Sequence, residues 1–205
     1  NYRGLVACGG FSYGDVLGAG RGWANKIIHN ENAYNALSLF FNSKDKFTLG
    51  VCNGCQMLSN LKEIIPGSSH WPSFTHNNSN QFEARQVLVK IPKSNSILFK
   101  GMHESIIPII VSHGEGKVTV SKSNDLKKIT MAYVDDSGKK TTSYPNNPNG
   151  SVSGATGFCN NDGRINIMMP HPERLMHINN FSWAPPKWKM SPWVKIFNNA
   201  REWVD

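Results

Sequence analysis

Two cysteines three positions apart, Cys52 and Cys55, lie in "LGVCNGCQMLSN" (49–60), between an apolar run and a second, periodic apolar stretch. Thiols at this spacing are typical of redox pairs and of half a zinc site, and one thiol at such a junction is typical of a nucleophile. Glycines stand two positions before and two after Cys52, at Gly50 and Gly54. The sharp strand-to-helix turn of a nucleophile elbow requires this frame. We therefore predict that Cys52 reacts and that Cys55 packs.

A redox pair and a zinc site each account for fewer of these residues than a nucleophile elbow does. A thioredoxin-like redox pair begins with the same strand, C-x-x-C and helix, but it accounts for neither glycine. A zinc site needs a second pair of ligands, and the two remaining cysteines, Cys8 and Cys159, are solitary. We therefore predict no metal site. The first N–H groups of the helix after Cys52 are expected to stabilise its thiolate and lower its pKa.

A thiol nucleophile needs a base, and the base needs a partner that orients it. In "IMMPHPERL" an apolar strand, 165–169, is followed by His171 and Glu173. Open α/β sheets place their sites at this carboxyl end of strands, and two residues two apart in an extended, Pro-flanked segment point to one side. We predict His171 as the base and Glu173 as the group that fixes its tautomer. The alternative is an exposed His–Glu loop.

An oxyanion hole would complete this chemistry. An elbow supplies one donor from the residue after the nucleophile, here the backbone N–H of Asn53, and a second strand-end turn supplies the other. The turn Gly9-Gly10-Phe11 follows an apolar strand, and glycine allows close backbone approach. We predict an oxyanion hole from Gly10, Phe11 and Asn53; the alternative is that these glycines only form the turn. No phosphate-binding glycine motif is present.

The composition indicates one domain, 1–205, with a substantial core, because 39% of the 205 residues are hydrophobic and 18% are charged. No apolar run is long enough for a membrane span or a signal peptide, so we expect a cytoplasmic protein with free thiols. The net charge of +8 is spread over single or paired basic residues such as Lys127-Lys128. This argues against nucleic acid and favours a solvated surface or docking on an acidic partner.

Hydrophobic periodicity predicts the elements that would position these groups. The pattern predicts a buried strand in "RGLVACGG", a loop over 9–22 and helical structure over 23–41. It also predicts a strand over 47–52 and a helix ended by Pro66-Gly67. The middle is rich in β patterns, including "ITMAYV" joined to "KKTTSY", and "ATGFCN" joined to "RINIMM" across Asn161-Asp162-Gly163.

Near the end, Ser191-Pro192 predicts a helix start, with Trp193, Ile196, Phe197 and Ala200 buried. Early alternation of strands and helices, followed by β-rich sequence, predicts an α/β fold: a three-layer, mostly parallel sheet with helices on both faces and an antiparallel β insertion.

Taken together, the motifs resemble the class I glutamine amidotransferase domain that ends the large, single-chain phosphoribosylformylglycinamidine synthases. The resemblance covers nearly the whole chain and rests on six strings in order: "GLVACGGFSYGDVLGAG", "LGVCNGCQMLSNLKEIIPGS", "FEAR", "VSHGEG", "YPNNPNGS" and "MMPHPERL". It implies that Cys52 attacks the side-chain amide of glutamine, giving a γ-glutamyl thioester and ammonia, with His171 as acid and base and Glu173 orienting it.

The resemblance also implies a partner and cofactors. Ammonia would pass to a synthetase domain of the same polypeptide, which uses ATP and Mg²⁺ to convert formylglycinamide ribonucleotide to its amidine; this segment itself would hold no cofactor. Gln56 matches a position that binds glutamine. Asn77, Ser79 and Phe82 would add contacts; alternatively they form a polar loop and one core aromatic. His113 and Glu115 of "HGEG" would line the site or its interface with the synthetase.

Members of the resembled family begin with an additional strand and helix before the position of Asn1. We therefore expect an exposed apolar edge and a segment that is not stable alone. Cys159 belongs to no motif and is expected to pack. Two other functions remain open at this stage: a stand-alone cysteine hydrolase of the same fold, and a binding or scaffold domain without chemistry.

Overall fold

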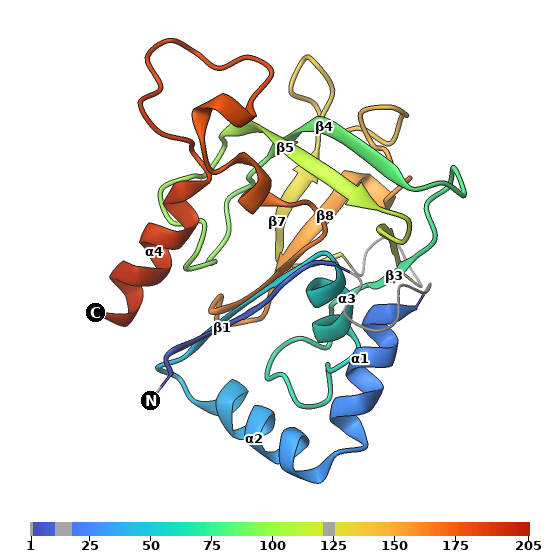
Figure 1. Ribbon diagram of the computed structural model, residues 1–205, viewed down its shortest axis with the longest axis vertical. Coiled ribbons are helices and arrows are strands. Elements are labelled where there is room, and N and C mark those ends of the chain that lie inside the picture. Colours follow the sequence, from blue (N-terminus) through green and yellow to red (C-terminus); the bar gives the residue numbers. More distant parts are fainter. Residues whose placement is uncertain (1, 11–17, 121–125) are drawn as a thin grey trace.

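The structure is a computed structural model that describes residues 2–10, 18–120 and 126–205. Within these residues a seven-stranded sheet has the order β1-β2-β9-β8-β7-β4-β5 (Figure 1). Its strands are β1 (Gly4–Ala7), β2 (Phe47–Val51), β4 (Glu83–Lys90), β5 (Ile106–His113), β7 (Ile129–Tyr133), β8 (Ala155–Cys159) and β9 (Ile165–Met168). A separate antiparallel pair consists of β3 (Ser73–Thr75) and β6 (Lys117–Thr119).

The parallel part of the sheet consists of β1, β2 and β9. All four residues of β9 are buried, as is most of β2, which fits the continuous apolar runs of strands covered on both faces. Figure 1 shows α4 (Val194–Val204) on the opposite side of these strands from α1 (Ala19–Ile28) and α3 (Asn53–Ser59). The predicted α/β fold with helices on both faces is confirmed.

The antiparallel part continues in the same sheet. Strand β9 pairs antiparallel with β8 across the predicted turn at 161–163, and β8, β7, β4 and β5 follow, each antiparallel to its neighbour. The predicted strand "KKTTSY" is wrong, because it reduces to one bridge between Val134 and Lys140. Asn147 donates from Nδ2 to the Thr141 carbonyl and draws that segment into a loop.

The predicted helix over 23–41 is two helices, α1 and α2 (Glu31–Asn42), and α1 begins earlier than expected, at Ala19. Asn30 separates them: its backbone is extended, and its side chain accepts the Ala33 N–H at 3.0 Å, so it caps a new helix. The third helix ends at Ser59, before the predicted Pro66. The side-chain Nδ2 of Asn60, the next residue, donates to the Gln56 carbonyl at 2.8 Å and caps the helix there.

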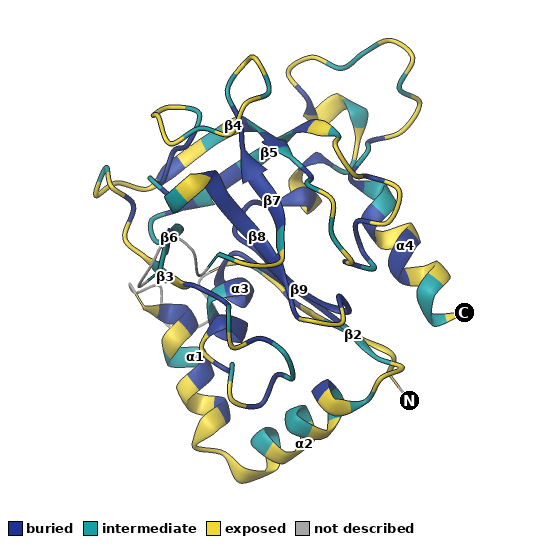
Figure 2. Cartoon of the chain, turned by 180° about the vertical axis from the view of Figure 1, so that it is seen from behind, coloured by how far each residue is buried: buried dark blue, intermediate teal, exposed yellow. Residues whose placement is uncertain are grey.

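Burial follows the sequence pattern with two exceptions. Figure 2 shows the central strands buried, whereas the predicted buried strand β1 lies at one edge of the sheet, so that Val6 is 46% exposed. Trp193, Ile196 and Ala200 are buried as predicted, but Phe197 is 37% exposed. The Ser191 hydroxyl accepts the Trp193 N–H before α4. No helix among the described residues is long and apolar enough to cross a membrane.

Candidate active site

The turn between β2 and α3 holds Cys52 in a conformation that few non-glycine residues adopt, with φ 53° and ψ −111°. Its N–H donates to the Met168 carbonyl of β9 at 2.8 Å, and its carbonyl accepts the Gln56 N–H at 3.0 Å. These two bonds join the end of one strand to the first turn of the helix. The sharp bend that the sequence predicts at Cys52 is therefore present.

Both flanking glycines stand where the backbone comes very close to its neighbours. A Cβ on Gly54 would lie 2.0 Å from the Ala7 carbonyl oxygen of β1. A Cβ on Gly50 would lie 2.6 Å from a Leu58 methyl carbon and 2.9 Å from the Gly54 carbonyl oxygen. Any side chain at these positions would push the helix away from the sheet, which explains the Gly-x-Cys-x-Gly spacing.

His171 and Glu173 form a hydrogen-bonded pair after β9. The His171 N–H donates to the Ile110 carbonyl of β5 at 2.8 Å, which fixes the backbone of the histidine against the neighbouring strand. Its ring Nδ1 lies 2.6 Å from Glu173 Oε1. The ring is buried, so the carboxylate accepts the Nδ1 proton and leaves Nε2 as the second working nitrogen.

Gly9 shows that the nucleophile and the base are neighbours. The position of a Cβ on Gly9 lies 2.7 Å from His171 Cε1 and 3.0 Å from Cys52 Cβ. The space beside Gly9, on the turn that follows β1, therefore borders both the Cys52 and the His171 side chains. Cys52, His171 and Glu173, which are far apart in the sequence, come together as predicted.

The charges of these groups act on one another. Burial alone lowers the pKa of His171, but the nearby Cys52 and the hydrogen bond with Glu173, together with the negative charges of both groups, raise it to about 9. Burial raises the pKa of Glu173, yet the hydrogen bond and positive charge of His171 hold it below its usual value. The imidazolium is thus the favoured form of His171 at neutral pH.

The other two buried thiols do not share this environment. Burial, with a smaller contribution from the charge of Cys52, raises the pKa of Cys55 well above its usual value. Burial likewise raises the pKa of Cys159 to about 11. Both side chains are fully buried, so the predicted packing roles of Cys55 and Cys159 are confirmed.

A cavity of about 220 Å³ opens beside Cys52 and His171. Its lining includes four residues predicted from the sequence: Gly10, Asn53, Gln56 and Phe82. Gly10 has φ 111°, a conformation that suits glycine. The third predicted oxyanion-hole residue, Phe11, lies outside the described residues.

Two predicted substrate contacts are not in this lining. Asn77 is buried, and its side chain is occupied by backbone groups: Nδ2 donates to the Gln81 and His113 carbonyls, and Oδ1 accepts the Gly116 N–H. Ser79 accepts the Gln81 N–H instead. Asn77 thus holds the loop that carries "HGEG", and neither side chain lies in the cavity lining, so their contact with substrate stays a prediction.

His113 and Glu115 do line the cavity, and a buried network orients the histidine. Asn149 directs Nδ2 to the Gly116 carbonyl at 2.8 Å and to His113 Nε2 at 3.1 Å, while its Oδ1 accepts the Ser151 N–H. The donors and acceptors around the amide fix its orientation, so Nε2 accepts and the proton of His113 lies on Nδ1. Burial, aided by the charge of His171, lowers the pKa of His113 to about 3.

Sequence reasoning missed Arg174 and Asn149. Arg174 follows Glu173 directly in "PHPERL" and is the one lysine or arginine in the described lining of the cavity. Because Arg174 lies one turn after His171, in the 3₁₀ segment Pro172–Leu175, its spacing from the histidine could have placed it in the site. Asn149 lies in "YPNNPNGS", a string that carried no chemical meaning before its contacts were known. Among the described residues, no group of three or more His, Cys, Asp or Glu is arranged to hold a metal ion.

The whole chain can also be compared with known proteins. A family model for the CobB/CobQ-like glutamine amidotransferase domain matches residues 1–204. This chain belongs to that family. The resemblance of the six sequence strings to glutamine amidotransferase domains is thus confirmed at the level of the family.

Solved structures support the fold of this amidotransferase. PurLQS from Thermotoga maritima is similar with a TM-score of 0.70 at 20% identity, over 100% of this chain and 81% of that chain. The glutaminase domain of CTPS from Trypanosoma brucei has a TM-score of 0.53 at 15% identity, over 98% and 71%. A putative GMP synthase protein from Thermoplasma acidophilum has a TM-score of 0.52 at 14% identity, over 98% and 72%.

Substituting Gly9 tests the packing of the catalytic pair. In Gly9→Ala the new methyl group displaces His171 from Cys52, so the sulfur loses its neighbouring imidazolium and reacts more slowly as a nucleophile. We expect alkylation of Cys52 by iodoacetamide to slow about tenfold, measured by mass spectrometry of its peptide. Gly114→Ala is the matched control, because the nearest side-chain atom to its Cβ, from Phe82, is 4.0 Å away. Equal rates in the two variants would contradict the proposed contact.

Proposed function

We propose that this chain is a glutaminase: it hydrolyses the side-chain amide of glutamine through a thioester on Cys52 and delivers ammonia to an acceptor elsewhere. The observation that carries the proposal is the placement of Cys52, on a strained turn, against a histidine that is itself bonded to Glu173. Family membership supports glutamine as the substrate.

The first step follows from the charges in the site. The Cys52 thiolate attacks the amide carbon, and the carbonyl oxygen becomes an oxyanion that the predicted backbone donors at Gly10 and Asn53 would stabilise. The His171 imidazolium gives its Nε2 proton to the leaving nitrogen, and ammonia departs. The neutral imidazole then removes a proton from water, which attacks the thioester and releases glutamate.

The cavity offers opposite charges for a zwitterionic substrate. Arg174 contributes a guanidinium for the α-carboxylate, and Glu115 contributes a carboxylate for the α-ammonium group. Glu115 is held in place, since its Oε2 accepts the Gly18 N–H at 2.7 Å and its carbonyl accepts from Gln56 Nε2. Gln56 therefore supports the substrate cavity through Glu115 as well as lining it.

The destination of the ammonia is the finer part of the proposal. The six sequence strings and the similarity in fold to PurLQS support a role in purine biosynthesis, in the cytoplasm. There, a synthetase domain of the same polypeptide would use ATP and Mg²⁺ to convert formylglycinamide ribonucleotide to its amidine. The chain described here would supply that domain with ammonia.

Removing the nucleophile is the direct test. Cys52→Ala abolishes glutamine hydrolysis, because no other described side chain in the cavity replaces the sulfur, whereas Cys55→Ala leaves most activity since that thiol only packs. Ammonia release is measured for both variants. Undiminished activity in Cys52→Ala contradicts the proposal, and failure of a chloroketone analogue of glutamine to label Cys52 favours a domain without chemistry.

The same assay distinguishes the proposed role from a stand-alone hydrolase. Glutamine hydrolysis by the full-length protein is measured with and without ATP and formylglycinamide ribonucleotide. A strong increase on their addition, with amidine formed, supports the synthase. Equal ammonia release in both conditions favours the stand-alone enzyme.

The pH profile tests the role of Glu173. In Glu173→Gln the imidazolium loses a stabilising charge, so the pKa of His171 falls from about 9 by about one unit. Because His171 must carry a proton to release ammonia, the alkaline limb of kcat moves to lower pH by the same amount. The kcat of glutamine hydrolysis between pH 6 and 10 measures it. If the alkaline limb does not move, Glu173 does not set the pKa of His171.

Arg174→Gln tests substrate binding. Loss of the guanidinium removes an attraction for the α-carboxylate that is present before and during reaction, so KM for glutamine rises about tenfold or more with kcat nearly unchanged. The variant also loses the preference for glutamine over its α-amide analogue. Arg201→Gln, on the exposed face of α4, is the matched control. A fall in kcat at constant KM would rule out the anchoring role.

A further inference from the structure

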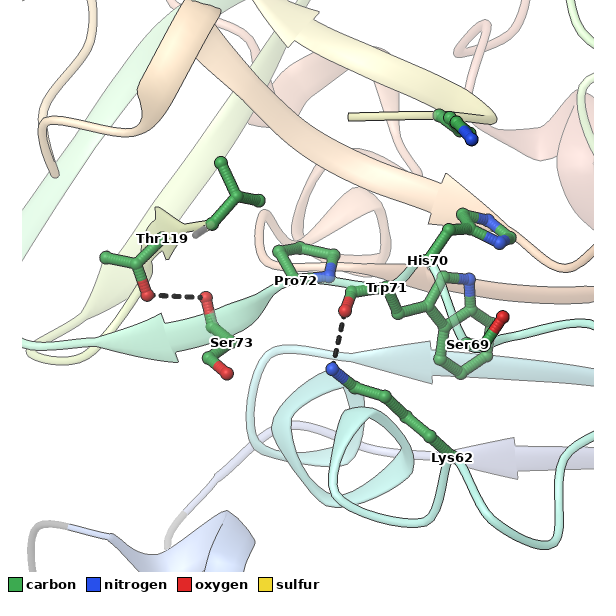
Figure 3. A pocket seen from close by; sticks show the side chains of 9 residues that line it. Lys62, Ser69, His70, Trp71, Pro72, Ser73 and Thr119 are labelled. Atoms are coloured by element: carbon green, nitrogen blue, oxygen red, sulfur yellow. Dashed lines mark hydrogen bonds between the residues drawn. The ribbon is translucent and has the colours of Figure 1, made fainter. Parts of the chain in front are cut away.

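A second cavity, of about 600 Å³, shares no lining residue with the catalytic one. It lies between the loop that follows α3, the segment before β3, and β6. Figure 3 shows Lys62 reaching up to the Trp71 carbonyl, with His70 on one side and with Ser73 and Thr119 on the other. Its volume falls within the range of roughly 300–1,000 Å³ that is usual for small-molecule sites.

The positive charge in this cavity has no acidic partner among the described residues. Lys62 donates to the Trp71 carbonyl, a neutral group, so that bond leaves the ammonium charge uncompensated. Burial lowers the pKa of Lys62, which is the cost of holding a charge there without a counter-ion. Lys127 lines the same cavity and, like Lys62, forms no ion pair with a described residue.

His70 shows that several positive charges converge on one place. Its Nε2 lies 3.0 Å from the Cys159 carbonyl, at the wall of the cavity. Burial lowers the pKa of His70, and although this hydrogen bond raises it, the charges of Lys128, Lys127 and Lys62 lower it further. Two ammonium groups that are far apart in the sequence, those of Lys62 and Lys127, thus line one concave surface, where field lines are concentrated.

We propose that this cavity binds the phosphate group of a small phosphorylated molecule. Lys62 and Lys127 supply the charge, and the Ser69 hydroxyl group in the lining supplies a further donor. Lysine ammonium groups bind phosphate as point charges, and the remaining volume accommodates an organic part. The buried Trp71 gives the cavity a rigid floor.

Site-resolved chemical protection tests this proposal in the full-length protein. An amine-reactive ester acylates lysines, and mass spectrometry measures the rate at each one. At a pyrophosphate concentration ten times its dissociation constant, acylation of Lys127 slows about tenfold. The exposed Lys187, which does not line this cavity, reacts at an unchanged rate. Sodium chloride at the same ionic strength changes the acylation rate of neither lysine.

Variants make the test specific to the cavity. Lys62→Met abolishes the protection of Lys127, Lys127→Met weakens the protection of Lys62, and Lys187→Met changes neither. Protection of Lys127 that survives in Lys62→Met, or that equals the protection of Lys187, overturns the proposal. Replacing pyrophosphate by a nucleoside diphosphate or a sugar phosphate identifies the source: tighter protection assigns an organic phosphate, and equal protection assigns inorganic phosphate. None of these readings depends on glutamine hydrolysis.

Discussion

The close approach of the turn at Cys52 to the end of β1 is the constraint on which the rest of the site depends. A residue at φ 53° is unfavourable by itself, and it persists because strand β9 holds its N–H while Gly54 lets the helix touch the Ala7 carbonyl. The sulfur is therefore presented at a fixed place and angle. Rigid support of this kind keeps Cys52 beside His171, which is itself held by Glu173 and by the Ile110 carbonyl.

The site draws on both halves of the sheet. Cys52 comes from the parallel part, His171 follows β9 at the junction, and the "HGEG" loop comes from the end of antiparallel β5. Asn149 and Asn77 hold this loop by bonding its backbone carbonyl and N–H groups, so buried polar side chains replace the regular ladder that a loop lacks. A catalytic cavity at this junction requires both parts to fold together.

Much of the site was predictable because its chemistry demands particular residues at particular spacings. The glycines around Cys52 and the pair His171 and Glu173 are such cases, since steric contact and extended geometry act over short distances in sequence. Asn77 is a harder case, because an amide suits substrate and backbone equally, and its buried contacts with backbone groups could not be read from the sequence. Helix boundaries failed where one side chain, that of Asn30, could cap a new helix inside a periodic pattern.

The bond from the His171 N–H to the Ile110 carbonyl has a mechanical consequence. Two residues away on β5, the Pro108 carbonyl accepts the indole N–H of Trp193, at the start of α4. The backbone of His171 is thus connected, through β5, to the N-cap residue of α4. A partner that shifted α4 would therefore also shift the imidazole of His171. Such a contact, made far from the substrate cavity, would change the rate of hydrolysis.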